Sequence, residues 1–139
     1  MRDHLATLLD DFRLYGSDIA VVHHHGDRRQ RTTYTQLARL ASRFAAWLDQ
    51  QSIQPGDRLL LWAENSAEWI AAFYGCLLRG VLVVPLDASG SPDFAARILA
   101  EVSPTLIVGD ELLLNQLGQI PIPTLKLEDF PAILPENAN

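Results

Sequence analysis

The stretch "NSAEWIAAFYGCLLRGVLVVPLD", residues 65–87, most constrains what this chain can fold into. Its pattern predicts a helix over residues 66–79, with Asn65 as the N-cap and Glu68 as its capping-box partner. Gly80 stands where a left-handed residue ends a helix, and an apolar strand follows it directly. A helix that runs straight into an apolar strand is typical of the crossover in a parallel sheet, so an α/β fold is expected.

The alternation of helix and strand continues along the chain. Short apolar runs bounded by turn residues predict four strands: Leu59–Trp62 after the turn at Pro55-Gly56-Asp57, Val81–Val84 stopped by Pro85, Thr105–Val108, and one around Thr124–Leu127. The strands Leu59–Trp62 and Val81–Val84 are expected to be buried because their runs are continuously apolar. Ser91-Pro92 opens a helix that Pro104 ends, and a short helix is expected near Glu111–Leu117. This order predicts a parallel, flavodoxin- or Rossmann-like sheet of about four strands with helices on both faces.

The region before the first of these strands is expected to hold two smaller elements and one long helix. Residues 4–15 predict a short amphipathic helix that Gly16 ends, and residues 19–33 a hairpin of Ile19–His24 and Arg29–Thr33 turning at Gly26-Asp27. Thr33 and Gln36 have the spacing of a capping box. Apolar residues three or four apart mark the core faces of the helices: Leu37, Leu40, Ala41, Phe44 and Leu48 in one, and Phe94, Ala95, Ile98, Leu99 and Val102 in another.

Composition excludes several classes of function. Net charge is −6, and the largest basic group is Arg28, Arg29 and Arg31, too few for tracking nucleic-acid phosphates. The single cysteine, Cys76, rules out a disulfide framework within the chain. No apolar segment has the length of a membrane span, and the start lacks a signal-peptide core, so a soluble cytoplasmic protein is expected.

The candidate chemical groups each have a simpler structural explanation. His23, His24 and His25 alternate sides on a strand and lack further ligands, so a metal site is not expected there. The loop Asp87–Pro92 lies where parallel sheets bind anions, yet it has no phosphate-loop pattern and no Lys, which favours a plain connection.

The carboxylates, the thiol and the aromatic residues can also be explained by structural roles. Asp57, Glu64, Glu68 and Asp87 suggest a carboxylate pair, but a turn, a cap and a strand end account for Asp57, Glu68 and Asp87. Cys76 lies in an apolar helix and is interpreted as core rather than nucleophile. Three aromatic residues at helical spacing are interpreted as core before an acyl pocket: Trp69, Phe73 and Tyr74. Ala71, Ala72 and Gly75 form a strip that lets a neighbouring backbone approach.

The order of these segments resembles the N-terminal region of the adenylate-forming (AMP-dependent synthetase and ligase) family. The matching features are Thr33-Tyr34, Pro55-Gly56-Asp57-Arg58, Asn65-Ser66 with Glu68, Leu77-Leu78-Arg79-Gly80, and Val84-Pro85-Leu86-Asp87. The resemblance spans about residues 17–130. Within the family, Arg79–Val83 and Ala88 look closer to acyl-CoA synthetases, especially fatty-acid ones, than to peptide-synthetase adenylation domains.

The resemblance implies a two-step activity for a full-length enzyme. A carboxylic, expected fatty, acid and ATP with magnesium give an acyl-adenylate and pyrophosphate, and the thiol of coenzyme A then displaces AMP. The family's phosphate loop ending Pro-Lys-Gly, its Thr-Gly-Asp motif and its C-terminal lysine have no counterpart here. No catalytic, cofactor-binding or metal-binding residue is therefore assigned.

Three interpretations remain open. In the first, residues 1–130 form the N-terminal subdomain of a ligase and residues 131–139 a linker toward downstream catalytic domains, with the chain inactive alone. Such a chain would expose apolar surface and could self-associate. The second is a stand-alone α/β binding or interaction module without catalysis. A flavodoxin-like receiver or flavin domain is the third, and it lacks the acidic cluster and the phosphate loop.

Overall fold

The computed structural model describes residues 19–25 and 28–130, with side chains from Thr32 onward. A two-stranded antiparallel hairpin, β1 (Ile19–His25) and β2 (Arg28–Thr33), leads into helix α2 (Tyr34–Gln50). Helices and strands then alternate as β3 (Arg58–Trp62), α3 (Ala67–Arg79), β4 (Leu82–Leu86), α4 (Pro92–Val102), β5 (Leu106–Gly109), α5 (Glu111–Gln116), β6 (Thr124–Lys126) and the 3-10 turn η2 (Leu127–Asp129). The helix expected over 4–15, the turn at 26–27 and the linker 131–139 lie outside the described residues.

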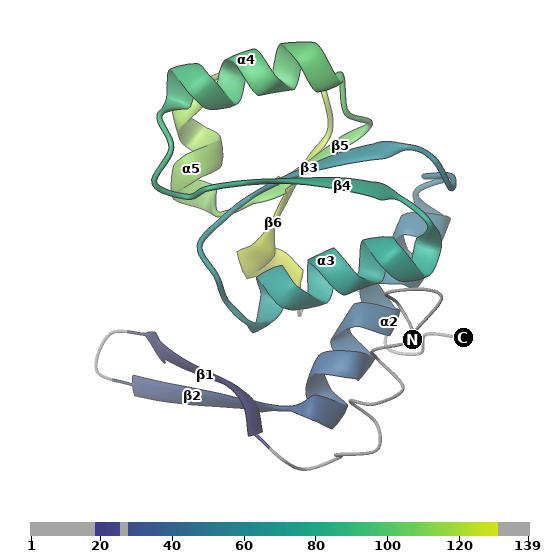
Figure 1. Cartoon of the computed structure of the whole chain (residues 1–139), viewed down its shortest axis with the longest axis vertical. Helices are drawn as coiled ribbons and strands as arrows, with labels where there is room; N and C mark the ends of the chain where they lie inside the picture. The colour runs from purple at the N-terminus through teal and green to yellow at the C-terminus, as the bar shows by residue number, and fades with distance from the viewer. Residues whose placement is uncertain (1–18, 26–27, 131–139) are drawn as a thin grey trace, which may run out of the picture.

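The sheet confirms the expected parallel α/β architecture. Its four strands are all parallel, in the order β4-β3-β5-β6. Helices α4 and α5 lie on one face and α2 and α3 on the other (Figure 1). β3 occupies the centre with β5, and Leu59, Leu60, Leu61 and Trp62 are all fully buried, as a continuously apolar run predicts.

Local signals set the helix boundaries. At the start of α2, the Thr33 side chain accepts a hydrogen bond from the Gln36 N–H (3.1 Å), and the Gln36 side chain accepts one from the Thr33 N–H (2.8 Å). This reciprocal pair is the predicted capping box. Gly80 ends α3 at a φ of 79°, in the left-handed region that favours glycine.

Helices α2 and α3 approach each other closely at Gly75. A Cβ at this position would lie 2.8 Å from the carbonyl oxygen of Ala41 and 2.8 Å from Cδ2 of Phe44. Ala71 and Ala72, on the same small-residue strip, are fully buried. The strip therefore does what the sequence predicted: it brings two helix backbones together over the core that Phe44 and Leu48 share with the sheet.

One cap prediction was wrong. The N-cap of α3 is Ser66, whose Oγ accepts a hydrogen bond from the Trp69 N–H (3.1 Å). Asn65 lies one residue earlier, and Glu68 is a first-turn residue rather than its capping-box partner. Ser and Asn are both good N-caps, so two adjacent candidates left the choice to the path of the chain leaving β3.

Strand β4 also differs from the prediction. It was expected to be buried and to stop at Pro85, but it extends to Leu86 and Pro85 lies inside it, paired in register with Leu61. The strand is at the edge of the sheet and none of its residues is fully covered. An edge position explains both findings, because an edge strand tolerates a missing N–H and lacks a neighbour on one side.

The core face of α4 is less buried than its spacing suggested. Ala95 is buried and Ile98 and Leu99 pack against the cluster of Leu60, Ile107 and Leu114. Phe94 instead remains 45% exposed, with the Arg97 guanidinium 5.9 Å from its ring centroid. The apolar spacing located the inward side of the helix but not how deeply each side chain enters the core.

Candidate functional site

The carboxyl ends of β3, β4 and β5 meet at one edge of the sheet, where α/β proteins of this kind bind ligands. The chain leaves β3 toward α3 on one face, whereas β4 and β5 lead to α4 and α5 on the other (Figure 1). The loop after β3 therefore runs to one face of the sheet, and the loops after its two neighbours, β4 and β5, run to the opposite face. Two surface hollows, each of about 530 Å³, lie at this edge.

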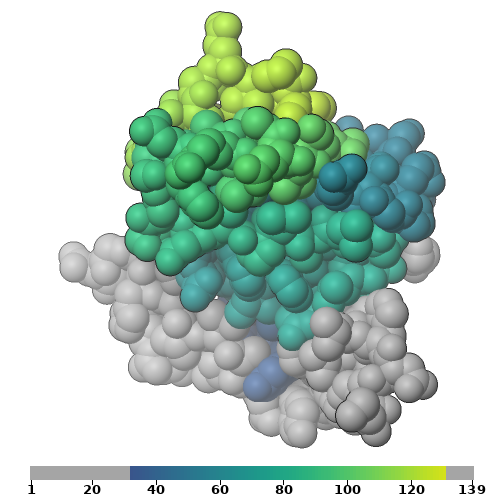
Figure 2. Space-filling view, turned by 45° about the horizontal axis from the view of Figure 1, so that its top comes forward, coloured from purple at the N-terminus to yellow at the C-terminus, as the bar shows by residue number. Residues whose placement is uncertain are grey.

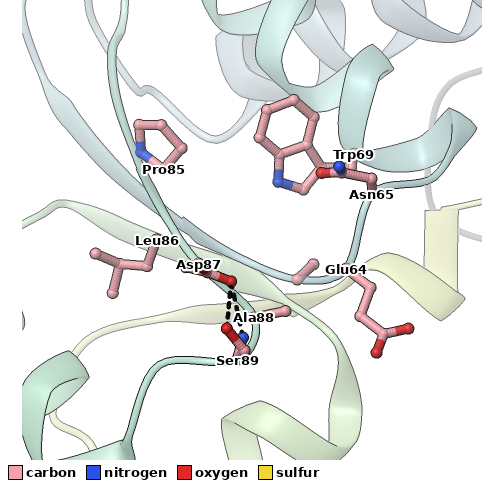
Figure 3. Close-up of a pocket in the computed structure, with 9 residues that line it drawn as sticks. Glu64, Asn65, Trp69, Pro85, Leu86, Asp87, Ala88 and Ser89 are labelled. Carbon is pink, nitrogen blue, oxygen red and sulfur yellow. Dashed lines mark hydrogen bonds between the residues drawn. The ribbon is translucent and has the colours of Figure 1, made fainter.

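The first hollow lies between the loops that follow β3 and β4 (Figure 3). The Trp69 ring and Pro85 face it, together with the polar residues Glu64, Asn65, Asp87 and Ser89. The buried indole of Trp62 fixes the loop after β4, since its Nε1–H donates to the Asp87 carbonyl oxygen at 3.0 Å.

Asp87 is committed to its own loop. One carboxylate oxygen accepts hydrogen bonds from the Ser89 N–H and the Ser89 hydroxyl, both at 2.9 Å. These bonds lower the pKa of the Asp87 carboxyl, since they favour its charged form. The Asp87 carboxylate thus already accepts the two Ser89 donors of the loop Asp87–Pro92, which would otherwise be available to an anion.

The second hollow lies between the ends of β3 and β5 and is strongly acidic. Its carboxylates come from three elements: Glu64 and Glu68 around the start of α3, Asp110 after β5, and Glu128 in η2. Leu112, Leu113 and Leu127 supply the apolar part of its lining.

Asp110 links two of the strand ends. Its Oδ2 accepts a hydrogen bond from the Glu64 N–H at 2.9 Å, and its own N–H donates to the Trp62 carbonyl oxygen at 3.2 Å. Partial burial raises the pKa of the Asp110 carboxyl, and the bond from Glu64 opposes this rise. The neighbouring carboxylates of Glu128, Glu64 and Glu68 raise that pKa further.

Glu128 occupies the amino end of α5. Both oxygens of its carboxylate accept from the Glu111 N–H, at 3.2 and 3.1 Å, whereas Asp110, the N-cap residue, makes no side-chain cap bond. The position at which a helix would offer an amide to an external anion is therefore filled by a carboxylate of the chain itself.

This arrangement repels anions. No Lys or Arg is among the described residues that line the two hollows, and Lys126 nearby forms an ion pair with Glu111 at 3.0 Å. Over the described residues, no group of three or more His, Cys, Asp or Glu side chains is arranged to hold a metal ion. In the same part of the chain, no buried side-chain N or O atom lacks a hydrogen-bond partner.

The structure separates the other predicted candidates. Asp57 accepts a hydrogen bond from the Gln54 N–H at 2.8 Å, which is the expected turn contact, far along β3 from the carboxylates at its other end. Cys76 is fully buried, and burial raises the pKa of its thiol to about 12, so it is core as predicted. The side chains of His23, His24 and His25 lie outside the described part of the structure.

The aromatic residues of α3 form a cluster on the partly covered side of the helix. The rings of Trp69 and Phe73 stack at 5.5 Å between centroids, and Phe73 meets Tyr74 edge-on at 5.7 Å. Trp69 and Phe73 pack against the main core, as expected, and Trp69 also reaches the first hollow.

Two residues of the acidic hollow were missed by sequence reasoning. Asp110 directly follows an apolar strand, a signal that could have identified it as a strand-end carboxylate. Glu128 had no such signal, because its partner Glu111 lies 17 residues away in the sequence.

The comparisons with known proteins agree with one another. Residues 10–136 match the family model described as AMP-binding enzyme. A substituted propanoyl:CoA ligase of Rhodococcus jostii is 33% identical over 78 residues, which are 56% of this chain and 15% of the relative. A linear gramicidin synthase of Brevibacillus parabrevis is 30% identical over 125 residues, 89% of this chain and 2% of the synthase.

A solved structure extends the match to three dimensions. The fatty acid AMP ligase of Legionella pneumophila superposes with a TM-score of 0.74 at 27% identity, over 89% of this chain and 24% of that one. The chain thus spans a small part of each of these relatives. No helix within the described residues is long and apolar enough to cross a membrane. The family match covers most of the chain, and the chain belongs to the adenylate-forming, AMP-binding enzyme family, of which it represents the N-terminal region.

Proposed function

We propose that the chain is the N-terminal scaffold of an AMP-forming acid–CoA ligase. The carboxylic acid that this ligase activates is proposed to be a fatty acid. In the full enzyme, the acid attacks ATP to give an acyl-adenylate and pyrophosphate. The thiol of coenzyme A then displaces AMP to give the acyl thioester. ATP, magnesium and coenzyme A would be held by regions of the enzyme beyond these 139 residues.

The acidic strand ends carry the scaffold part of this proposal. Catalysis of adenylation needs donors that stabilise charge on the phosphates of ATP. Here the carboxylates of Asp87, Asp110 and Glu128 occupy the amides at the edge where such donors would be offered. In this proposal the described part of the chain supplies the scaffold, and the nucleotide is held elsewhere in the enzyme.

Three observations support activation of a fatty or related carboxylic acid rather than an amino acid. The Rhodococcus relative is named a CoA ligase, and the Legionella neighbour a fatty acid AMP ligase. In addition, residues 79–83 read Arg-Gly-Val-Leu-Val and residue 88 is Ala. Peptide-synthetase adenylation domains more often read Lys-Ala-Gly-Ala-Ala-Tyr-Val-Pro-Leu-Asp-Pro over this region.

A second candidate is activation of an amino acid by a peptide synthetase. It is favoured by the match to the gramicidin synthase, which covers more of this chain than the match to the CoA ligase does. The two candidates share the adenylation step and differ in the acid and in the thiol that accepts it.

The test measures pyrophosphate exchange by the whole protein against a panel of fatty acids and amino acids, followed by thioester formation with coenzyme A. We expect exchange with fatty acids and acyl-CoA as the product. Exchange confined to amino acids, with no acyl-CoA, would replace the first candidate by the second.

The stand-alone interaction module needs a separate test. An antibody raised against the chain would reveal the size of the native species in source cells. We expect a species several times larger than 15.5 kDa. A native species of 15.5 kDa would overturn the ligase proposal and turn the search toward binding partners.

A further inference from the structure

Trp62, at the carboxyl end of β3, is hydrogen-bonded to the loops that follow both neighbouring strands. On the β5 side, its carbonyl oxygen accepts from the Asp110 N–H at 3.2 Å. The backbones are so close there that a Cβ on Gly109 would overlap the Trp62 carbonyl group. On the β4 side, the fully buried indole donates its Nε1–H to the Asp87 carbonyl oxygen at 3.0 Å. The centre of the sheet thus holds Trp62 in place, and Trp62 holds the loop after β4.

The loop after β4, residues 87–90, follows a strand that is paired on one side within the described sheet. In Figure 2 the surface of α3 and β4 lies open below that of α4. The loop's own bonds are local: the Gly90 N–H donates to the Asp87 carbonyl oxygen at 2.9 Å, and Ser89 bonds the Asp87 carboxylate. The indole bond instead joins the loop to β3, across 25 positions in the sequence. A buried N–H without an acceptor is costly, so this bond fixes where the loop lies.

This loop forms one wall of the first hollow. Asp87 and Ser89 lie on that wall, and Asn65 and the Trp69 ring come from the side of β3 and α3 (Figure 3). No Lys or Arg is among the described residues that line the hollow, and the carboxylates there repel phosphates. Apolar surface and uncharged donors and acceptors remain for a ligand. The lining therefore favours an uncharged group over the triphosphate of ATP.

We propose that Trp62 is a positioning residue, whose indole N–H braces the loop after β4 so that the first hollow keeps its shape for an uncharged part of the acid or of the thiol acceptor. This inference rests on the proposed function. Trp62 does not line the hollow itself and acts through the Asp87 carbonyl group.

The test uses three variants of the whole enzyme. Trp62→Phe removes the indole N–H together with part of the ring. A second variant carries 3-benzothienylalanine at position 62, whose ring has the size of indole and no N–H, so it separates the hydrogen bond from the loss of volume. Trp47→Phe is the matched control, because Trp47 packs on Phe44 in α2, away from this edge. Circular dichroism would verify that each variant folds.

Amide hydrogen exchange measures the brace directly. We expect the amides of Ser89 and Gly90 to exchange about fivefold faster or more in both position-62 variants, as the loss of one buried hydrogen bond predicts. The Leu82 amide, which donates to the Asp57 carbonyl oxygen at the other end of β4, is the internal reference and should keep its rate. Unchanged exchange at Ser89 and Gly90 would overturn the proposal.

Steady-state kinetics measures the consequence for the reaction. In both position-62 variants we expect the KM for the acid or for the thiol acceptor to rise about threefold or more, with kcat and the KM for ATP within about twofold of the parent. A rise for the acid alone assigns the hollow to its apolar chain, and a rise for the thiol alone assigns it to the acceptor. Unchanged KM values, an equal rise for ATP, or an effect of Trp62→Phe that the benzothienyl variant lacks would each reject the positioning role.

The failure of this proposal can be distinguished from the failure of the proposed function. A parent enzyme that activates acids, with variants that keep its KM values, retains the ligase and rejects the role of Trp62. A parent protein that forms no adenylate from any acid rejects the ligase and, with it, the positioning role.

Discussion

Gly75 shows how a single missing side chain sets the distance between two helices. On an exposed helix, replacing Gly by Ala adds about 1 kcal/mol of stability. At Gly75, however, the new methyl group would lie 2.8 Å from a backbone oxygen of α2, which cannot move aside as a side chain can. Overpacking of this kind costs roughly 1–3 kcal/mol.

We therefore expect Gly75→Ala to lower the free energy of unfolding by about 1–2 kcal/mol, measured by urea denaturation of the chain. The exposed helical residue Ala96 provides the comparison, since Ala96→Gly changes only helix propensity and should cost about 1 kcal/mol. A gain in stability for Gly75→Ala would contradict this expectation, because it would show that α2 and α3 can move apart without a cost in free energy.

Asp110 is a carboxyl group whose charged form the fold disfavours. Its pKa is raised above the ordinary value of 3.8, so the folded state binds a proton more tightly than the unfolded state does. The stability linked to this proton is present at low pH and is lost as pH rises from the unfolded pKa through the folded one.

Asp110→Asn keeps an oxygen for the Glu64 N–H and removes the charge. We expect the variant to be more stable than the parent at pH 7, with the difference shrinking as pH falls toward 4. Urea midpoints across this range provide the measurement. A constant difference at all pH values would show that charge at Asp110 is not the cause.

At the scale of elements, the start of α3 separates two adjacent candidate caps. Ser66 makes the cap bond to the Trp69 N–H, whereas Asn65 makes none in the described structure. We expect Ser66→Ala to cost about 1 kcal/mol of stability. Asn65→Ala is the matched control and should change stability by less than half as much. Thermal unfolding of both variants decides the point, and equal losses would mean that both residues cap the helix.

Strand β4 depends on Pro85 to keep its edge unpaired. Pro85→Ala would restore an outward N–H on an apolar edge strand, next to that of Val83. We expect the variant chain to self-associate at lower concentrations than the parent, as measured by sedimentation. Val84→Ala, whose N–H faces β3, is the control and should leave association unchanged. A monomeric Pro85→Ala chain would indicate that other features guard this edge.

At the scale of the whole molecule, the edge of the sheet where α/β proteins commonly bind nucleotides is acidic. Self-supplied carboxylates fill the amides at the strand ends, and four acidic residues surround the second hollow. We expect the 139-residue chain to show no measurable binding of ATP with magnesium by calorimetry, and no acid-dependent pyrophosphate exchange. Micromolar affinity for ATP would contradict the scaffold role.

The sequence predicted more of the fold than of the candidate site. Strands, helices and the Gly80 stop follow from patterns read within a few residues, and over residues 19–25 and 28–130 the structure confirms them with shifts of one or two positions at their ends. The acidic hollow could not be predicted from the sequence because its residues are far apart along the chain. The hydrogen bond between Asp110 and Glu64 joins residues 46 positions apart, and the one between Glu128 and Glu111 joins residues 17 positions apart. Only folding brings such groups together.

The sequence by itself determined the alternation of elements, the capping box of α2 and the small-residue strip of α3, because each depends on interactions within or next to one element. The tertiary structure alone decided the strand order β4-β3-β5-β6. That order made β4 an exposed edge that tolerates Pro85, and it placed β3 and β5 side by side so that their carboxylates converge. The physical reason is that strand order depends on how all helices pack on both faces at once, which no short stretch of sequence specifies.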